Sequence, residues 1–153
     1  MSVTGAAKTS SATLRRARAD DAAELARLSG QLGYPQDATV FASRLRRLLV
    51  SADHPVIVAT DDDRSLLGFI ALENRLMLEL GERVEIVGLV VDEGARRRGI
   101  GQALVHAAED WAREIGVAEV MVRSNIARAQ SHPFYEDAGF TRTKTQHVYR
   151  KRL

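Results

Sequence analysis

The stretch from Val84 to Gly116 constrains the fold more than any other part of this 153-residue chain. Residues 84–91 are almost wholly apolar, which is typical of a central strand buried on both faces. A glycine-containing loop follows, and apolar residues at helical spacing predict a helix over 100–115. Gly116 stands where a left-handed helix end belongs. A buried strand that leads through a short loop into a long helix predicts a mixed α/β fold.

The other segments extend this prediction to the whole chain. Asp21 and Glu24 have the spacing of a helix capping box, and Asp37 can cap a second helix. The expected order is β-α-α-β-β-β-α-β-α-β-β, an α/β (α+β) fold with a mixed central sheet of six to seven strands and about four helices. The predicted segments are strand 13–18, helices 21–32 and 37–49, a hairpin of 56–59 and 66–72, strands 75–80 and 117–122, helix 128–138, and one or two closing strands within 140–153.

Composition limits the classes of protein to which the chain can belong. Hydrophobic residues make up 45% and charged residues 27%, the balance of a soluble globular protein. We expect one domain over 13–153, preceded by a disordered tail over 1–12, and a cytoplasmic location with no membrane segment. The absence of cysteine excludes disulfides and any acyl-thiol intermediate on the protein. A net charge of only +2 gives no strong field toward nucleic acid, and a homodimer stays open.

The loop between the predicted buried strand and the long helix has the properties of an anion site. Gly99 and Gly101 permit a tight turn, and the helix start adds unpaired N–H groups and the positive end of its dipole. Arginines at 96–98 can add charge-assisted hydrogen bonds to phosphates. No Gly-Lys-Ser/Thr ends the loop, and Arg96 replaces the first glycine of the dinucleotide fingerprint. A pyrophosphate is the predicted ligand, and an ordinary basic turn is the alternative.

Two motifs in this order resemble those of the GNAT acetyltransferases. The loop reads Arg96-Arg97-Arg98-Gly99-Ile100-Gly101, which is similar to the family's motif A, where the pyrophosphate of acetyl-CoA is cradled. A second motif follows downstream, with Ser124-Asn125, Arg128 and the run Phe-Tyr-Glu-Asp-Ala-Gly-Phe over 134–140. The resemblance covers nearly the whole chain beyond its tail. It implies an acetyl-CoA-dependent N-acetyltransferase in which a primary amine attacks directly in a ternary complex, without a metal.

The resemblance also implies roles for individual residues. Tyr135 would protonate the departing sulfur, although an amphipathic core tyrosine is the alternative. Gly88 would mark a bulge that splays its strand from 117–122, unless it serves close packing against a helix. Asn125 would bind the cofactor or form a turn. The residues expected to bind the cofactor are Leu89, Val90, Val91, Arg96, Arg97, Arg98, Gly99, Ile100, Gly101 and Asn125.

Glu85 is the expected general base. It lies fourteen residues before Gly99, the offset at which the histone-acetyltransferase branch of the family carries its base. A carboxylate on an apolar strand is expected to have a raised pKa, which suits proton abstraction. The alternatives are a glutamate at the wet edge of the strand, or one paired with Arg83 or with an arginine of the second helix.

The acceptor is the least constrained part of the function. Glu73 and Glu79, with further glutamates on the same strands, would attract a polycationic amine such as an aminoglycoside or a polyamine. Val120 replaces the glutamate that ribosomal-protein N-terminal acetyltransferases carry, and the spacing from Asn125 to Tyr135 resembles that of aminoglycoside 6′-N-acetyltransferases. A peptide N-terminus or lysine is the second acceptor class. Two alternatives are not enzymes: a non-catalytic acetyl-CoA sensor and a nucleic-acid-binding module.

Overall fold

The computed structural model describes residues 12–61 and 64–153. The predicted tail, residues 1–12, lies outside these ranges except for its last residue. The chain divides into two compact units, the first ending at Arg123 and the second comprising Ser124–Leu153. None of the helices in the described ranges is long and apolar enough to cross a bilayer.

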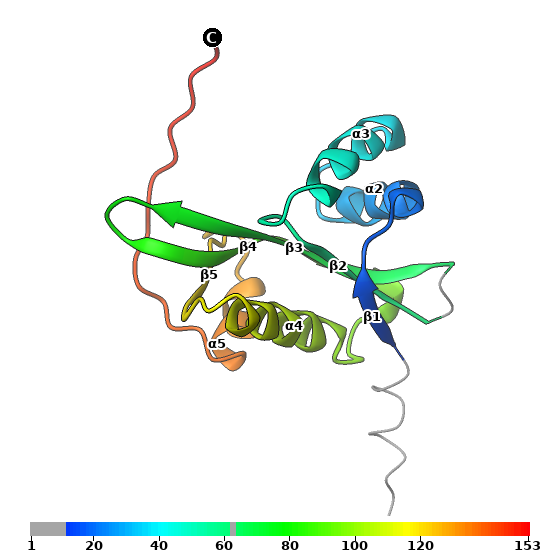
Figure 1. Cartoon of the computed structure of the whole chain (residues 1–153). Coiled ribbons are helices and arrows are strands. Elements are labelled where there is room, and N and C mark those ends of the chain that lie inside the picture. Colours follow the sequence, from blue (N-terminus) through cyan, green and yellow to red (C-terminus); the bar gives the residue numbers. More distant parts are fainter. Residues whose placement is uncertain (1–11, 62–63) are drawn as a thin grey trace, which may run out of the picture. The chain divides into compact units, whose positions relative to one another are not determined.

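The first unit is a five-stranded sheet with helices on both faces. In Figure 1, α2 and α3 lie on one side of the sheet and α4 on the other. Neighbouring strands run antiparallel from β1 to β4, and β5 joins β4 in parallel, giving the order β1-β2-β3-β4-β5. The elements are β1 (Thr13–Arg16), α2 (Ala22–Gln31), α3 (Ala38–Leu49), β2 (Val56–Thr60), β3 (Leu66–Met77), β4 (Gly81–Val91), α4 (Ile100–Glu114) and β5 (Val120–Val122), with 3-10 turns at Ala19–Asp21 and Glu93–Ala95.

The predicted α/β fold is confirmed, with differences at the strands. The segment 66–72 and the first part of 75–80, expected to be separate strands, form one continuous strand, β3, which ends at Met77; residues 78–80 lie in the turn before β4. β5 covers only the second half of the expected 117–122. The closing strands expected within 140–153 are absent, so the sheet has five strands rather than six or seven. Residues 141–153 are exposed throughout and rich in basic side chains, so they have no buried face to pack.

The helix starts follow local hydrogen bonding. Asp37 caps α3 as predicted, its carboxylate accepting from the N–H of Thr39 at 2.7 Å. The capping box predicted for Asp21 and Glu24 is wrong, because each carboxylate has other partners. Asp21 accepts from the N–H of Arg18 at 2.7 Å, whereas Glu24 accepts from the N–H of Leu66 at 3.0 Å and so ties α2 to β3.

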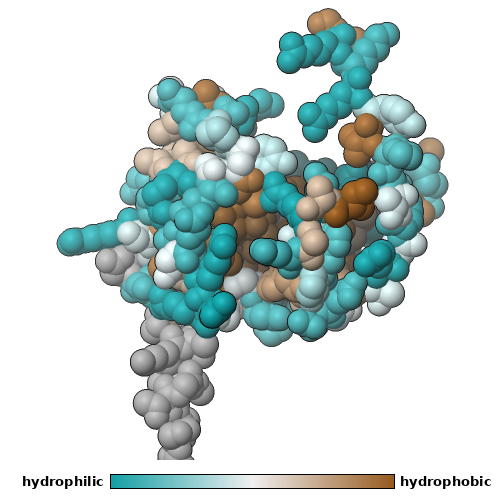
Figure 2. Space-filling view, turned by 180° about the vertical axis from the view of Figure 1, so that it is seen from behind, coloured by the Kyte–Doolittle hydropathy of each residue, from teal (hydrophilic) through white to brown (hydrophobic). Residues whose placement is uncertain are grey.

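The core between α2, α3 and the sheet is built from small and branched apolar residues. Leu28 and Val58 are fully buried there, with Leu25, Leu45 and Phe69 around them. Most of the face seen in Figure 2 carries hydrophilic side chains, with hydrophobic ones visible between them. Because α2 and α3 share this core with β2 and β3, they hold a fixed position over one face of the sheet.

The second unit contains one short helix. α5 spans Ser131–Asp137, shorter than the expected 128–138 because a turn precedes it, in which the N–H of Arg128 bonds to the Asn125 carbonyl at 2.9 Å. The helix ends at Asp137, shortly before the predicted Gly139, which has a left-handed backbone (φ 93°) and donates its N–H to the Glu136 carbonyl at 3.1 Å.

Candidate active site

One edge of β4 is open beyond Ile86, where its neighbour β5 ends. β5 pairs with β4 only from Val84 to Ile86, and in the described part of the chain Gly88–Val91 have β3 as their sole strand partner. The register with β3 shifts by one residue at the same point, which leaves Val87 as a bulge. The bulge predicted at Gly88 is therefore confirmed one residue earlier. The prediction that this strand is buried on both faces is wrong at Val87. This residue has no neighbour in β5 and is 54% exposed.

Alternation along the β3–β4 ladder decides which backbone groups face the open edge. The N–H of Asp92 donates to the Leu67 carbonyl at 2.7 Å. Bonded and non-bonded pairs alternate in an antiparallel ladder, so Val90, two residues earlier, also bonds to β3. The N–H and C=O groups of Leu89 and Val91 then point to the open side. Of the three residues predicted to meet the cofactor on this strand, Leu89 and Val91 have backbone groups on the open side, whereas those of Val90 face β3.

The predicted anion loop follows directly. Gly99 begins α4 with a left-handed backbone, φ 76°, which an L side chain adopts only with strain. The peptide N–H groups of Ile100 and Gly101 belong to the first turn of α4, where no intrahelical carbonyl can accept from them. With α4 fifteen residues long, its dipole adds a positive partial charge at the same end.

The three arginines of the loop differ in their surroundings. Arg96 and Arg97 are exposed, and Arg97 also has a positive φ of 65°. Arg98 is half-buried, and its guanidinium pairs with the carboxylate of Asp61 at 3.0 Å. That ion pair ties the loop to the end of β2, so Arg98 helps to hold the loop in place.

Residues of α2 that the sequence did not single out hold the other side of the loop. Gln31 donates from Nε2 to Asp92 at 2.9 Å and accepts at Oε1 from the N–H of Glu93 at 3.1 Å. Arg27 reaches the same Asp92 carboxylate at 3.3 Å. These contacts span more than sixty residues of sequence, so no local spacing could have revealed them.

Glu85 lies buried at the point where β4 and β5 separate. Its carboxylate accepts from Arg123 Nε at 2.6 Å and Nη2 at 3.1 Å, and from Arg75 Nη1 at 2.9 Å. Burial alone would raise the pKa of Glu85, but the hydrogen bonds and charges of Arg123 and then Arg75 outweigh it, and the pKa is lowered. The raised pKa expected from the sequence is therefore wrong. The alternative, a pairing of Glu85 with Arg83 or with an arginine of the second helix, is also wrong in its partners, which are Arg123 and Arg75.

The other predicted acidic residues are divided between strand and turn. Glu73 lies opposite Glu85 across the β3–β4 ladder, and its carboxylate is 3.7 Å from Arg75 Nε. Glu79 lies in the exposed turn between β3 and β4. Of these two glutamates, only Glu73 is therefore a neighbour of Glu85 on the sheet.

Tyr135 and Asn125 belong to the second unit. The Tyr135 ring makes edge contacts with Phe134 and Phe140, with centroids 5.3 and 5.7 Å apart. Burial raises the pKa of the Tyr135 hydroxyl, partly offset by the charge of Arg128, so the group is protonated at neutral pH. Asn125 accepts at Oδ1 from the N–H of Ala127 at 2.9 Å, the contact of a turn former.

Comparison with known proteins identifies the family. The model of the acetyltransferase (GNAT) family matches residues 20–140. This chain belongs to that family.

The relatives carry related names. An aminoglycoside N(6′)-acetyltransferase type 1 of Klebsiella aerogenes is 36% identical over 101 residues, 64% of this chain and 66% of that protein, so the alignment spans slightly less than two thirds of the relative. A protein of the same name from Stenotrophomonas maltophilia is 29% identical over 148 residues, 94% and 95% of the two chains. The structure of AAC(6′)-Iy with the bisubstrate analogue CoA-S-monomethyl-acetylneamine superposes with a TM-score of 0.82, at 20% identity, over 93% of this chain and 99% of the other.

Proposed function

We propose that this protein is an N-acetyltransferase that transfers the acetyl group of acetyl-CoA to a primary amine of a small molecule. The observation that supports it most is the open edge of β4, where Leu89 and Val91 turn their backbone groups outward a few residues before the glycine cradle of α4. An extended ligand with an anionic end can pair with such an edge as a strand does, while its phosphates meet the helix start. Those are the chemical features of acetyl-CoA.

The reaction needs no covalent intermediate on the protein. Acetyl-CoA supplies a thioester carbonyl; the amine nitrogen bonds to its carbon, the C–S bond breaks, and the products are an N-acetyl amide and the free thiol of coenzyme A. The N–H of Leu89 would donate to the thioester oxygen as negative charge develops there. Tyr135 would give its proton to the sulfur, a role for which a hydroxyl protonated at neutral pH is suited. In the cradle, the N–H groups of Ile100 and Gly101 and the guanidiniums of Arg96 and Arg97 would bind the phosphates.

We assign Glu85 to positioning. A carboxylate with a lowered pKa and three arginine hydrogen bonds accepts a proton poorly. The same contacts connect β4, β3 and the end of β5 at the point where the strands diverge, so they would fix the width of the opening. The amine's proton would then leave through water. The general-base role expected from the resemblance stays a prediction, and the Glu85→Gln variant in the Discussion tests it.

The names of the relatives put aminoglycosides first among the acceptors to test. The purified chain would be mixed with acetyl-CoA and single amines, including neamine, spermidine, amino acids and a peptide with a free N-terminus, and thiol release would be measured. Amine-dependent thiol release with an N-acetyl product found by mass spectrometry is the expected result. Coenzyme A binding without turnover on any amine would favour the sensor, and absence of binding would contradict the proposal.

A further inference from the structure

An apolar pocket opens on the sheet face that carries α2 and α3. Its volume is about 120 Å³, and it lies wholly within the first unit. The lining residues come from α2, α3, β2 and β3 and are apolar apart from one arginine: Leu25, Phe41, Arg44, Leu45, Leu48, Val56, Phe69 and Ala71. An apolar cavity of about 150 Å³ can hold a benzene ring. This pocket therefore suits a branched aliphatic or small aromatic group.

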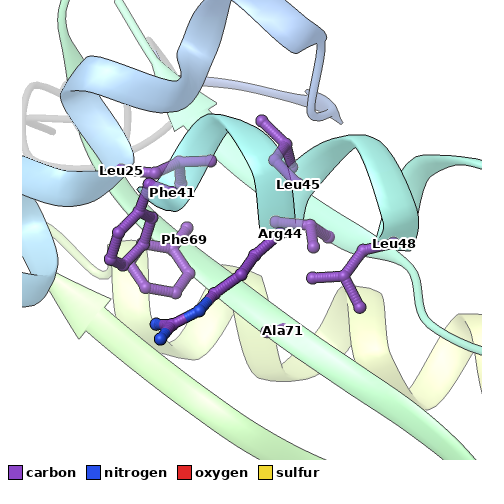
Figure 3. Close-up of a pocket in the computed structure, with 8 residues that line it drawn as sticks. Leu25, Phe41, Arg44, Leu45, Leu48, Phe69 and Ala71 are labelled. Carbon is purple, nitrogen blue, oxygen red and sulfur yellow. The ribbon is translucent and has the colours of Figure 1, made fainter. Parts of the chain in front are cut away.

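Arg44 borders the pocket with the aliphatic part of its side chain, and its guanidinium lies beyond the apolar lining. Its side chain points from α3 toward the strand that carries Phe69 and Ala71 (Figure 3). Arg44 is exposed, and within the described ranges its guanidinium has no hydrogen bond or ion pair. A charged group at the mouth of an apolar pocket, with its donors unused, is a feature of anion recognition.

A second hollow continues from the same arginine. It is lined by Arg44, Arg47, Leu48, Ser51 and His54, with a volume of about 420 Å³. Neither hollow has an acidic side chain in its lining. The charge around both is therefore positive.

The carboxylates expected to attract a polycation do not offset this charge. The carboxylate of Glu85 is paired with the guanidiniums of Arg75 and Arg123, and the carboxylate of Glu73 is 3.7 Å from Arg75 Nε. By alternation along β3 and β4, Arg83 is on the same sheet face as these residues. Arg83 lies 3.5 Å from the carboxylate of Glu119. Three guanidiniums thus pair with three carboxylates here, and the charges of Arg44 and Arg47 are additional to these pairs.

The pocket adjoins the open edge of β4. A Cβ built on Gly88 would lie 3.5 Å from Phe69 Cε2 and 3.7 Å from the Ala71 Cβ, ordinary contact distances to two lining residues. The helix packing considered for Gly88 is therefore not what the residue serves, because its neighbours are β3 side chains. Leu89, whose N–H faces the open edge, is the next residue. One strand spacing, about 5 Å, separates the floor of the pocket from that edge.

We propose that the acceptor is an amine that carries a carboxylate and an apolar group on the carbon bearing its nitrogen, the chemistry of an apolar α-amino acid. The acceptor's apolar side chain would fill the pocket lined by Phe41 and Phe69. Its carboxylate would pair with Arg44, and its amine would face the open edge beside Leu89. This inference rests on the proposed function. It names an acceptor class that the polycationic aminoglycosides do not belong to.

The experiment compares acceptors that differ in one group at a time. Thiol release from acetyl-CoA is measured with leucine, with leucinamide, which lacks the carboxylate, with glycine, which lacks the apolar group, and with neamine. We expect leucine to have the highest kcat/KM. In Arg44→Gln the preference for leucine over leucinamide should fall by about ten- to a hundredfold, the effect of a lost charge-assisted hydrogen bond. Arg46→Gln, an exposed neighbour on α3 that lines neither hollow, should leave that preference unchanged.

A second variant tests the apolar part without removing the charge. Ala71→Val adds methyl groups to the floor of the pocket, and valine suits a strand, so the fold should survive. The preference for leucine over glycine should fall. Higher kcat/KM for neamine than for leucine, or an equal effect of Arg44→Gln and Arg46→Gln, would overturn the inference while leaving the acetyltransferase proposal intact. Absence of thiol release with every amine would overturn the proposed function itself.

Discussion

Arg123 Nε lies 2.6 Å from the Glu85 carboxylate. Arg123 directly follows Val122, the last residue of β5 that pairs with β4. Arg75 reaches the same carboxylate from β3. Glu85 is thus the shared acceptor of two guanidiniums from the two neighbouring strands. Removing one partner of a buried ion pair costs more than the pair contributes, because the remaining charges lose their counterion.

Glu85→Gln should therefore destabilise the protein by about 1–3 kcal/mol, measured by urea unfolding. Turnover should fall as the strand ends lose their fixed position, but the acidic limb of the pH–rate profile should stay in place for each of several acceptors of different basicity. Glu82→Gln, an exposed glutamate on the same strand, is the control and should change neither quantity. A limb that moves or vanishes in Glu85→Gln would restore Glu85 as the general base.

The lowered pKa of Glu85 also predicts how stability depends on pH. Its folded pKa lies below the ordinary value of 4.5, so the unfolded chain binds the proton more readily. The stabilisation is complete above pH 4.5 and is lost as the pH falls through the folded pKa. Urea unfolding at pH 7, 4.5 and 3 should show a smaller acid loss in Glu85→Gln than in the wild type. Asp21, whose pKa Arg15 and Arg18 lower against the effect of burial, should contribute a residual acid loss in both proteins.

Tyr135→Phe tests the proton donor. The ring keeps its contacts with Phe134 and Phe140, so stability should change little, while the acidic proton is lost. Turnover should fall by about 10²- to 10⁴-fold with coenzyme A affinity unchanged. Tyr149→Phe, an exposed tyrosine near the C-terminal end, serves as the control. If chemistry is rate-limiting and turnover stays within twofold of the wild type, Tyr135 is a packing residue.

The cradle can be tested with two glycines of one loop. Gly99→Ala must adopt a left-handed backbone, at a cost of about 1 kcal/mol or more, and should weaken coenzyme A binding measured by calorimetry. Gly99→Glu adds a negative charge at the helix start and should abolish it. Gly94→Ala is the matched control, because a Cβ at Gly94 meets open space and its φ is not left-handed. Equal binding by all three variants would contradict the assignment of the loop.

The sequence predicts what depends on neighbours along the chain. The strand, loop and helix from Val84 to Gly116 are found where the apolar periodicity and glycines put them. Contacts between segments far apart in the sequence could not be predicted from local patterns. Nothing in local spacing connects Gln31 to Asp92, or Arg123 to Glu85, and without those arginines the burial of Glu85 pointed to a raised pKa. The prediction of closing strands within 140–153 was wrong for the same reason. Whether a segment forms a strand depends on a neighbouring strand elsewhere in the chain, which the segment's own residues do not determine.

Gly68 connects the stability of the sheet to the cradle. A Cβ at this residue would lie 2.7 Å from the Val90 carbonyl oxygen and 3.3 Å from Val91 Cα, both backbone atoms that cannot turn away. It would also meet Ile100 Cγ2, the first residue of α4, at 3.4 Å. Gly68→Ala must therefore push β3 from β4 or lift the start of α4, at a cost of about 1–3 kcal/mol.

Because α4 begins at that contact, the same variant should weaken coenzyme A binding as well as stability. Gly30→Ala in α2 is the control, since its Cβ would meet nothing within 4 Å and alanine favours a helix by up to about 1 kcal/mol. Thermal unfolding with and without coenzyme A separates the two effects. A Gly68→Ala protein that unfolds at the wild-type temperature would show that β3 and β4 can separate without strain. One that loses stability but binds coenzyme A as tightly as the wild type would show that the strain is absorbed within the sheet and does not reach the first turn of α4.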